Sequence, residues 1–285
     1  MRLQRVVRGV SVNAVAVARG VFALASTSLA LWILVFGQWV PQPLPAGLAL
    51  RDILTYAGAV VILLASVGLC IARTAVASVL TLGAYQAVSA ALAVPQALAT
   101  PQSLDAWYPF VEAVTPLAGA GVLYVMVRRS MRGPSAAHAE RTTLRAAQSL
   151  FGATCVFYGA SHFAYAAYTA TLVPAWLPAP LLVAYATGAC HVAAGLALII
   201  GIAPRLAAAL EATMMSLFGL VVWIPSFFAQ PHPSWARPAA QRWSELVVTF
   251  VLAAAAGVVT LSFGREPGAH ASGAGLRHRP SGATP

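Results

Sequence analysis

Long apolar runs, separated by short polar or proline-rich breaks, form the main pattern of this chain. Eight of these runs come near the roughly 20 residues that an α-helix needs to cross about 30 Å of hydrocarbon. They are residues 21–40, 55–72, 74–94, 109–127, 146–172, 182–203, 206–228 and 246–264. We therefore expect an all-α membrane protein with eight transmembrane helices. Tryptophans at the ends of these runs, such as Trp39, are expected to anchor the helices at the membrane interface.

The polar breaks divide the chain into segments. Residues 1–20 are basic and predict either a short interfacial helix or a frayed cytoplasmic tail. The longest internal break, 128–145, contains several arginines and a Gly-Pro pair, and we interpret it as a cytoplasmic linker between two units, 21–127 and 146–264. Residues 265–285 are rich in Gly, Ser, His and Arg, a composition typical of a disordered tail.

The two units resemble each other. The segment VPQPLP at 40–45 matches VPAWLP at 173–178, an offset of 133 residues. Further pairs occur in the same order at nearly the same offset: Val94-Pro95 with Ile224-Pro225, and Trp107 and Glu112 with Trp243 and Glu245. The pattern predicts two tandem four-helix bundles. With an even number of spans in each, both would have the same orientation, related by an axis along the membrane normal.

Composition and charge agree with this interpretation. The chain is 60% hydrophobic and 8% charged, whereas a soluble domain carries about 25% charged residues. All 17 basic residues are arginines and they lie between apolar runs, so the net charge of +10 indicates membrane topology rather than nucleic-acid binding. With eight spans, all but Arg51, Arg237 and Arg242 fall on one side. The positive-inside rule then predicts both termini in the cytoplasm and a location in the inner (plasma) membrane.

Two histidines lie within neighbouring apolar runs. His162 and His191 are each about 14–15 Å from the same membrane face, so antiparallel neighbouring helices would bring them to one level. Tyr158, His162 and Tyr165 follow an i, i+4, i+7 stripe on one helix face. Ionisable residues at membrane depth often mark a functional path. Such a pair could relay protons, hydrogen-bond a quinone or bind a metal; alternatively, it could only lock two helices together through hydrogen bonds.

Two carboxylates extend the candidate site. Glu211 lies about one and a half helical turns from the cytoplasmic end of its run. It could be the inner station of a proton path, or it could snorkel to the interface or bond a neighbouring helix. Glu245 begins the last run. Its carboxylate could complement the dipole at the start of that helix, or it could join an outer cluster with Arg242. The first-half positions that match His162, His191 and Glu211 are apolar or small, so we expect the site in the second half.

The sequence offers little support for a metal centre. Two histidines without a third ligand or a spacing motif predict no metal site, and they disfavour haem. The three cysteines, Cys70, Cys155 and Cys190, lie in apolar runs without a CxxC pair and are expected to be buried free thiols. Phosphate loops and hydrolase patterns are absent, so the sequence does not decide whether the protein is an enzyme.

Several motifs of the second half recur together in one family. The run Gly159-Ala160-Ser161-His162-Phe163, then VPAWLP, then Thr187-Gly188-Ala189-Cys190-His191, then Pro204-Arg205-Leu206-Ala207, resembles the DoxX-like family of membrane proteins. The resemblance covers about residues 147–261. It implies a four-helix membrane bundle. Because the family is named after a subunit linked to thiosulfate:quinone oxidoreduction, it also implies a quinone- or redox-associated subunit that works with a partner redox or membrane subunit. The alternative is a non-enzymatic carrier or scaffold for a small molecule or a partner protein.

Overall fold

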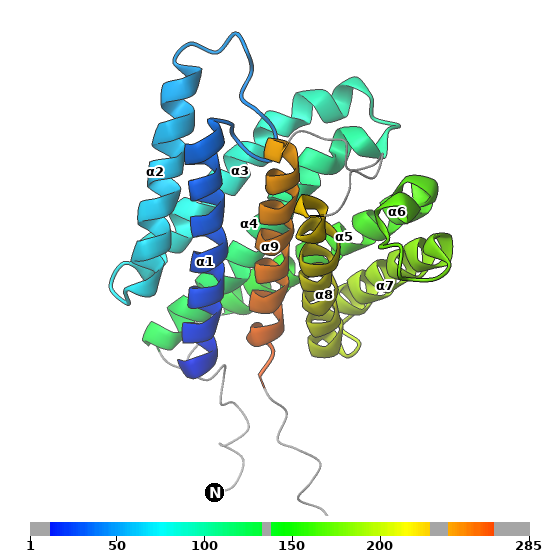
Figure 1. Ribbon diagram of the computed structural model, residues 1–285. Coiled ribbons are helices and arrows are strands. Elements are labelled where there is room, and N and C mark those ends of the chain that lie inside the picture. The colour runs from blue at the N-terminus through cyan, green and yellow to red at the C-terminus, as the bar shows by residue number, and fades with distance from the viewer. Residues whose placement is uncertain (1–11, 133–137, 229–238, 265–285) are drawn as a thin grey trace, which may run out of the picture.

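The computed structural model describes residues 12–132, 138–228 and 239–264, and within these ranges it is helical without a strand (Figure 1). The helices are α1 (Val12–Phe36), α2 (Arg51–Cys70), α3 (Ala75–Ala99), α4 (Leu104–Arg132), α5 (His138–Ala164), α6 (Ala166–Leu172), α7 (Pro180–Ile200), α8 (Pro204–Phe218) and α9 (Ala239–Ser262). Between α8 and α9 lie a π-helical turn, η1 (Gly219–Trp223), and a 3₁₀ turn, η2 (Pro225–Phe227). Most of the expected interfacial helix, and the expected tail from residue 265, lie outside the described residues.

The protein is a multi-pass membrane protein. Among the described residues, seven helical segments are long and apolar enough to cross a membrane: α1, α2, α3, α4, α7, α9 and the stretch from Pro204 to Phe227. Large apolar side chains such as Leu24, Leu64 and Leu182 point outward on these helices, which suits contact with lipid. The fifth predicted span, 146–172, is not among the seven; the chain there forms two helices, α5 and α6, divided at Tyr165.

Helix ends differ from the ends of the apolar runs. Helix α4 continues to Arg132 and α5 begins at His138, so both enter the break that was interpreted as a linker. Arginine, alanine and glutamate are good helix formers, so a polar stretch can leave the membrane and still remain helical. The third apolar run was expected to end at residue 94, but α3 continues through Pro95 to Ala99.

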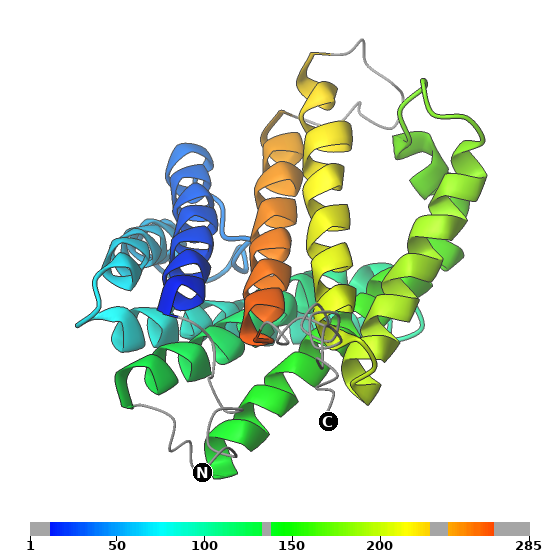
Figure 2. The ribbon, with the colours of Figure 1, turned by 90° about the horizontal axis from the view of Figure 1, so that it is seen from below.

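The helices pack in sequence order within each half of the chain. Helix α1 contacts α2, α2 contacts α3 and α3 contacts α4; in the second half α5 contacts α7, α7 contacts α8 and α8 contacts α9. Figure 2 shows α1 and α2 at one end of the molecule and α6 and α7 at the other, with α8 and α9 between them. Across the halves, α1 packs on α9, α5 packs on α4, and α4 packs on α9.

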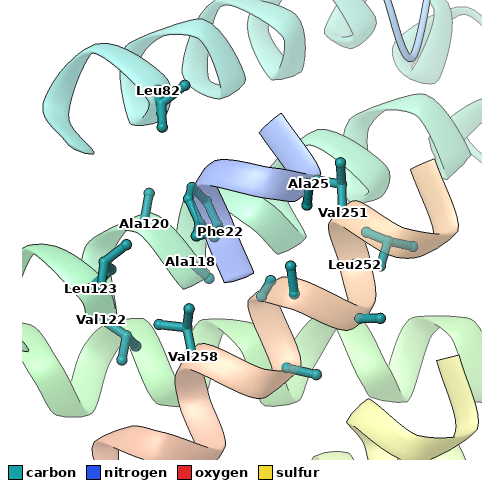
Figure 3. Packing of buried hydrophobic residues seen from close by; sticks show 14 of the residues in the cluster. Phe22, Ala25, Leu82, Ala118, Ala120, Val122, Leu123, Val251, Leu252 and Val258 are labelled. Carbon is teal, nitrogen blue, oxygen red and sulfur yellow. The ribbon is translucent and has the colours of Figure 1, made fainter. Parts of the chain in front are cut away.

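Small side chains allow the two halves to come close at the centre. A methyl group built on Gly119 of α4 would lie 2.8 Å from the Cβ atom of Ala255 on α9. Figure 3 shows Phe22 of α1 beside Ala118 of α4, with Val251 and other small apolar side chains of α9 nearby. In a membrane, where water does not drive helices together, such close approach between small residues is a principal source of packing energy.

One arginine in each half holds the end of a neighbouring helix. In the first half the Arg19 Nε of α1 donates to the carbonyl oxygen of Leu69, at the end of α2, over 2.6 Å. In the second half the Arg145 Nη1 and Nη2 of α5 donate to the carbonyl oxygens of Leu198 and Ile199, at the end of α7, over 2.9 and 2.6 Å. A cation at these otherwise unpaired carbonyls satisfies them and complements the negative end of the helix dipole.

Candidate polar site between α5, α7 and α8

Two pairs of facing glycines set the register of α5 against α7. A methyl group built on Gly159 would lie 2.6 Å from the carbonyl oxygen of Gly188, and one on Gly152 would lie 2.7 Å from that of Gly195. The two glycines on each helix are two turns apart and therefore lie on one face. Their packing brings the backbones of the antiparallel helices into contact and fixes which side chains meet.

The two predicted histidines meet at this interface. The ring centroids of His162 and His191 are 5.1 Å apart and the rings lie edge to face. His191 is fully buried, whereas His162 is half-buried and stacks on Phe218 of α8. The Nδ1 atom of His162 is 3.0 Å from the hydroxyl oxygen of Thr187. The structure thus places both imidazoles at one level, between α5, α7 and α8.

His191 also pairs with a carboxylate. Its Nδ1 lies 2.8 Å from the Glu211 Oε1, and both side chains are 1% exposed. Helix α7 ends at Gly201, whose φ of 83° is a left-handed conformation that glycine adopts readily, and α8 begins at Pro204, a residue favoured at the first helical position. This hairpin returns the chain antiparallel, so residues equally far from Gly201 come together. Glu211 therefore bonds a neighbouring helix, which was one of the expected alternatives, and it does not snorkel to the interface.

Two polar atoms of this pair have no partner. The His191 Nε2 and the Glu211 Oε2 are buried without a hydrogen bond. Leaving such an atom unpaired costs about 1–3 kcal/mol, more for a charged group, and most buried polar atoms in proteins are therefore paired. Cys155 of α5 is buried beside them, and its thiol is close enough to donate a weak hydrogen bond to the Glu211 carboxylate, so the His191 Nε2 is the clearer of the two unpartnered atoms. Cys155 is buried as expected, but Cys70 and Cys190 are exposed.

The two tyrosines of the predicted stripe have different surroundings. Tyr158 is buried, its ring centroid is 6.1 Å from that of His191, and its hydroxyl oxygen is 3.0 Å from the Oγ1 of Thr115 on α4. Tyr165 instead lies at the break between α5 and α6, and its hydroxyl oxygen accepts a hydrogen bond from the backbone N–H of Asp105 over 3.2 Å. Tyr158 therefore lies beside the histidines, whereas Tyr165 links α5 to the start of α4.

Glu245 belongs to a second cluster. It is half-buried on α9 and close enough to Glu112 of α4 for their charges to interact. Tyr108 of α4 lies within electrostatic range of both carboxylates, and its ring centroid is 6.2 Å from that of Tyr158. Sequence reasoning noted Glu112 only as the counterpart of Glu245. The shared offset of 133 residues was the signal that could have placed them together.

In the first half, an aromatic side chain fills the space that corresponds to the histidine site of the second half. The Trp39 ring lies 4.6 Å from that of Tyr85, and its Nε1 donates to the Ser89 Oγ over 2.8 Å. The Tyr85 hydroxyl donates to the carbonyl oxygen of Val40, and Gly58 leaves room for the indole. Trp39 therefore packs within the first half, and its place at the membrane interface stays a prediction. These polar atoms have partners within the chain, in contrast to those of the second half.

Metal chemistry has no cluster of ligands to support it in the described ranges. In these ranges, no group of three or more His, Cys, Asp or Glu side chains is arranged to hold a metal ion. The polar site consists of acid–base groups: two imidazoles, a carboxylate, a phenol and a thiol. Such groups can donate, accept and transfer protons.

Comparison of the sequence with known protein families gives a match over the segment that contains this site. The DoxX family model matches residues 144–224, which extend from α5 into η1 and include His162, His191 and Glu211. The predicted DoxX-like character is confirmed for this segment. No curated protein and no solved structure matches the chain.

Proposed function

We propose that this protein is a quinone-associated redox subunit of the inner membrane, in which His191 and Glu211 bind the polar head of a quinone and exchange protons with it. The observation that carries the proposal is the buried His191 Nε2, which has no hydrogen-bond partner. If the pair served only to join α7 to α8, its one 2.8 Å contact would suffice and the remaining atoms would gain from apolar replacement.

The donor set fits a quinone head group. When neutral His191 carries its proton on Nδ1, towards Glu211, its Nε2 accepts a hydrogen bond from a hydroxyl. When the ring is protonated, Nε2–H becomes a donor to a carbonyl oxygen, and the adjacent Glu211 carboxylate stabilises the imidazolium. A bound quinone would supply the carbonyl oxygens, which become hydroxyls on two-electron reduction by a partner redox subunit. The site therefore matches both forms of the head group.

The neighbouring side chains position the pair. Glu211 fixes the orientation of the His191 ring, as second-layer carboxylates commonly do for imidazoles that act on a ligand. His162 packs edge to face on His191 and lies closer to the surface, since it is half-buried. Phe218 stacks on His162 and keeps that side apolar. Such apolar walls limit access of water to the acid–base groups.

The proposed topology has eight membrane crossings, with α5 and α6 together as the fifth, and both termini in the cytoplasm. It consists of two four-helix units in parallel orientation. Two observations support it. The first is that the helix contacts of one half recur in the other, where the contact of α1 with α9 is the counterpart of the contact of α5 with α4. The contacts of Arg19 with α2 and of Arg145 with α7 are also equivalent.

The test is the quinone content of the purified protein. We would extract the wild-type protein, His191→Gln and Glu211→Gln and measure bound quinones by mass spectrometry. Tyr85→Phe is the matched control, because it removes a buried polar group from the first half. We expect stoichiometric quinone in the wild type and in Tyr85→Phe and its loss in both site variants. A wild-type protein that carries no quinone after purification in mild detergent and addition of membrane lipids would contradict the proposal.

A further inference from the structure

Helix α4 carries polar side chains along one face, from its exposed start towards the middle of the bilayer. They are Asp105, Tyr108, Glu112 and Thr115, which we name the α4 stripe. The spacings of three, four and three residues place all of them on one side of the helix. At 1.5 Å per residue the stripe extends about 15 Å along the helix. Polar groups are costly in such a position, so a continuous row of them requires a reason.

The inner end of the α4 stripe meets the candidate site. Thr115 and Tyr158 are both buried, and their hydroxyl oxygens are 3.0 Å apart. Tyr158 in turn lies beside His191, with 6.1 Å between the centroids of the two rings. A phenol hydroxyl can donate and accept at once, so Tyr158 can join a hydroxyl on α4 to the imidazole on α7.

The middle of the α4 stripe carries a pair of carboxylates. Glu112 and Glu245 come from α4 and α9, one from each half of the chain, and their charges lie within interaction range. Tyr158 from α5 lies within the same range of Glu112, and Tyr108 lies within range of both carboxylates and of Asp105. When two carboxylates lie within interaction range, both cannot easily be charged, so one of them tends to keep a proton. The pair can therefore hold a proton between the surface and the candidate site.

We propose that the α4 stripe, with Glu245 and Tyr158, is the route by which protons pass between the His191–Glu211 pair and the membrane face at which α4 begins. The inference rests on the proposed function, because it supplies the protons that a quinone site needs. Each step moves a proton between a carboxyl, a hydroxyl or an imidazole and changes no oxidation state. In this route the first half of the chain, which has no counterpart of the histidines, supplies the connection to water.

The experiment measures how fast the ring proton of His191 exchanges with solvent. Full-length protein with ¹⁵N-labelled histidine is placed in lipid bilayers and transferred to D₂O, and loss of the His191 N–H signal is followed by solid-state NMR. The signal is assigned by its absence in His191→Gln. The test variants are Glu112→Gln and Tyr158→Phe, which keep the size and shape of each side chain. Their matched controls are Asp52→Asn, an exposed acid at the start of α2, and Tyr85→Phe, a buried tyrosine of the first half.

We expect each test variant to slow exchange by about tenfold or more, because a positioned proton-transfer group contributes at least that much, while both controls keep the wild-type rate. An unchanged rate in either test variant would overturn the route. The quinone content of the same preparations separates this result from the proposed function. If exchange is slow in the two variants but the wild type binds no quinone, the route is upheld and the proposed function is refuted. If the wild type binds quinone but exchange in the variants is unchanged, only the route is refuted.

Discussion

His191 and Glu211 lie ten residues on either side of Gly201, and the hairpin at that glycine brings the His191 Nδ1 to 2.8 Å from the Glu211 Oε1. The pair is buried at membrane depth on two helices of the DoxX-matching segment that a short turn joins. Only one atom of each side chain is used in this contact. The pair is thus both a link between α7 and α8 and the proposed ligand-binding group.

Breaking the pair from one side is expected to be costly. His191→Leu or Glu211→Leu alone leaves the other group buried without its partner, which should lower the free energy of unfolding by about 3–5 kcal/mol. The double variant His191→Leu/Glu211→Leu leaves no such group and should recover most of that loss. Unfolding in mixed detergent, followed by circular dichroism, gives the three values. Additive losses in the double variant would show that the two side chains are not coupled.

The glycine contacts between α5 and α7 should be sensitive to a single methyl group. Gly159→Ala places a Cβ 2.6 Å from the carbonyl oxygen of Gly188, so the helices must separate. We expect a loss of about 1–3 kcal/mol, typical of overpacking. The matched control is Gly257→Ala on α9, where a new Cβ meets nothing within 4 Å and helix propensity improves. Thermal unfolding of the two variants tests this, and equal stability of both would refute the contact.

Both helix-end arginines should stabilise the fold. Arg19→Met and Arg145→Met keep much of the side-chain length and remove the cation that binds the last carbonyls of α2 and α7. Each is expected to lower stability by about 1 kcal/mol, and Arg145→Met more, because Arg145 makes two hydrogen bonds. Arg51→Met, at a partly exposed side chain, is the control. An effect of Arg51→Met as large as the other two would argue against specific helix-end contacts.

The fifth membrane crossing can be tested by labelling. In a variant without native cysteines, Thr142→Cys near the start of α5 and Ala175→Cys after α6 should react with an impermeant maleimide from opposite sides of the membrane. The two positions should lie on opposite sides because α5 and α6 together cross the membrane between residues 142 and 175. Labelling of whole cells, before and after permeabilisation, distinguishes the sides. Reaction of both positions from the same side would mean that this segment does not cross.

Much of the fold was predictable because lipid imposes one strong rule, that backbone polar groups must be satisfied within a helix. The apolar runs therefore marked the positions of most helices. Their ends were harder to predict, since the polar residues after Val127 and before Ala146 favour helix in water as well as in lipid. The break at Tyr165 had no sequence signal, because neither glycine nor proline occurs there.

The candidate site was predicted in part. Equal depth and neighbouring runs indicated that His162 and His191 would meet, and their ring centroids are 5.1 Å apart. The pairing of His191 with Glu211 was missed because their depths were counted from opposite membrane faces rather than from the turn at Gly201. Thr115 was missed because it comes from the first half, and no local pattern predicts which helices of two units will touch. That these residues bind a ligand stays a prediction.

The central claim is that the free Nε2 of His191 binds the head group of a quinone. Its most direct test is ¹⁵N NMR of histidine-labelled protein in bilayers, titrated with a short-chain quinone, with Glu211→Gln as the comparison. The account predicts that the Nε2 resonance of His191 shifts and saturates in the wild type, and that the shift is lost or greatly weakened in Glu211→Gln. A His191 Nε2 resonance that stays unchanged while quinone is added to saturation of the bilayer would contradict the account.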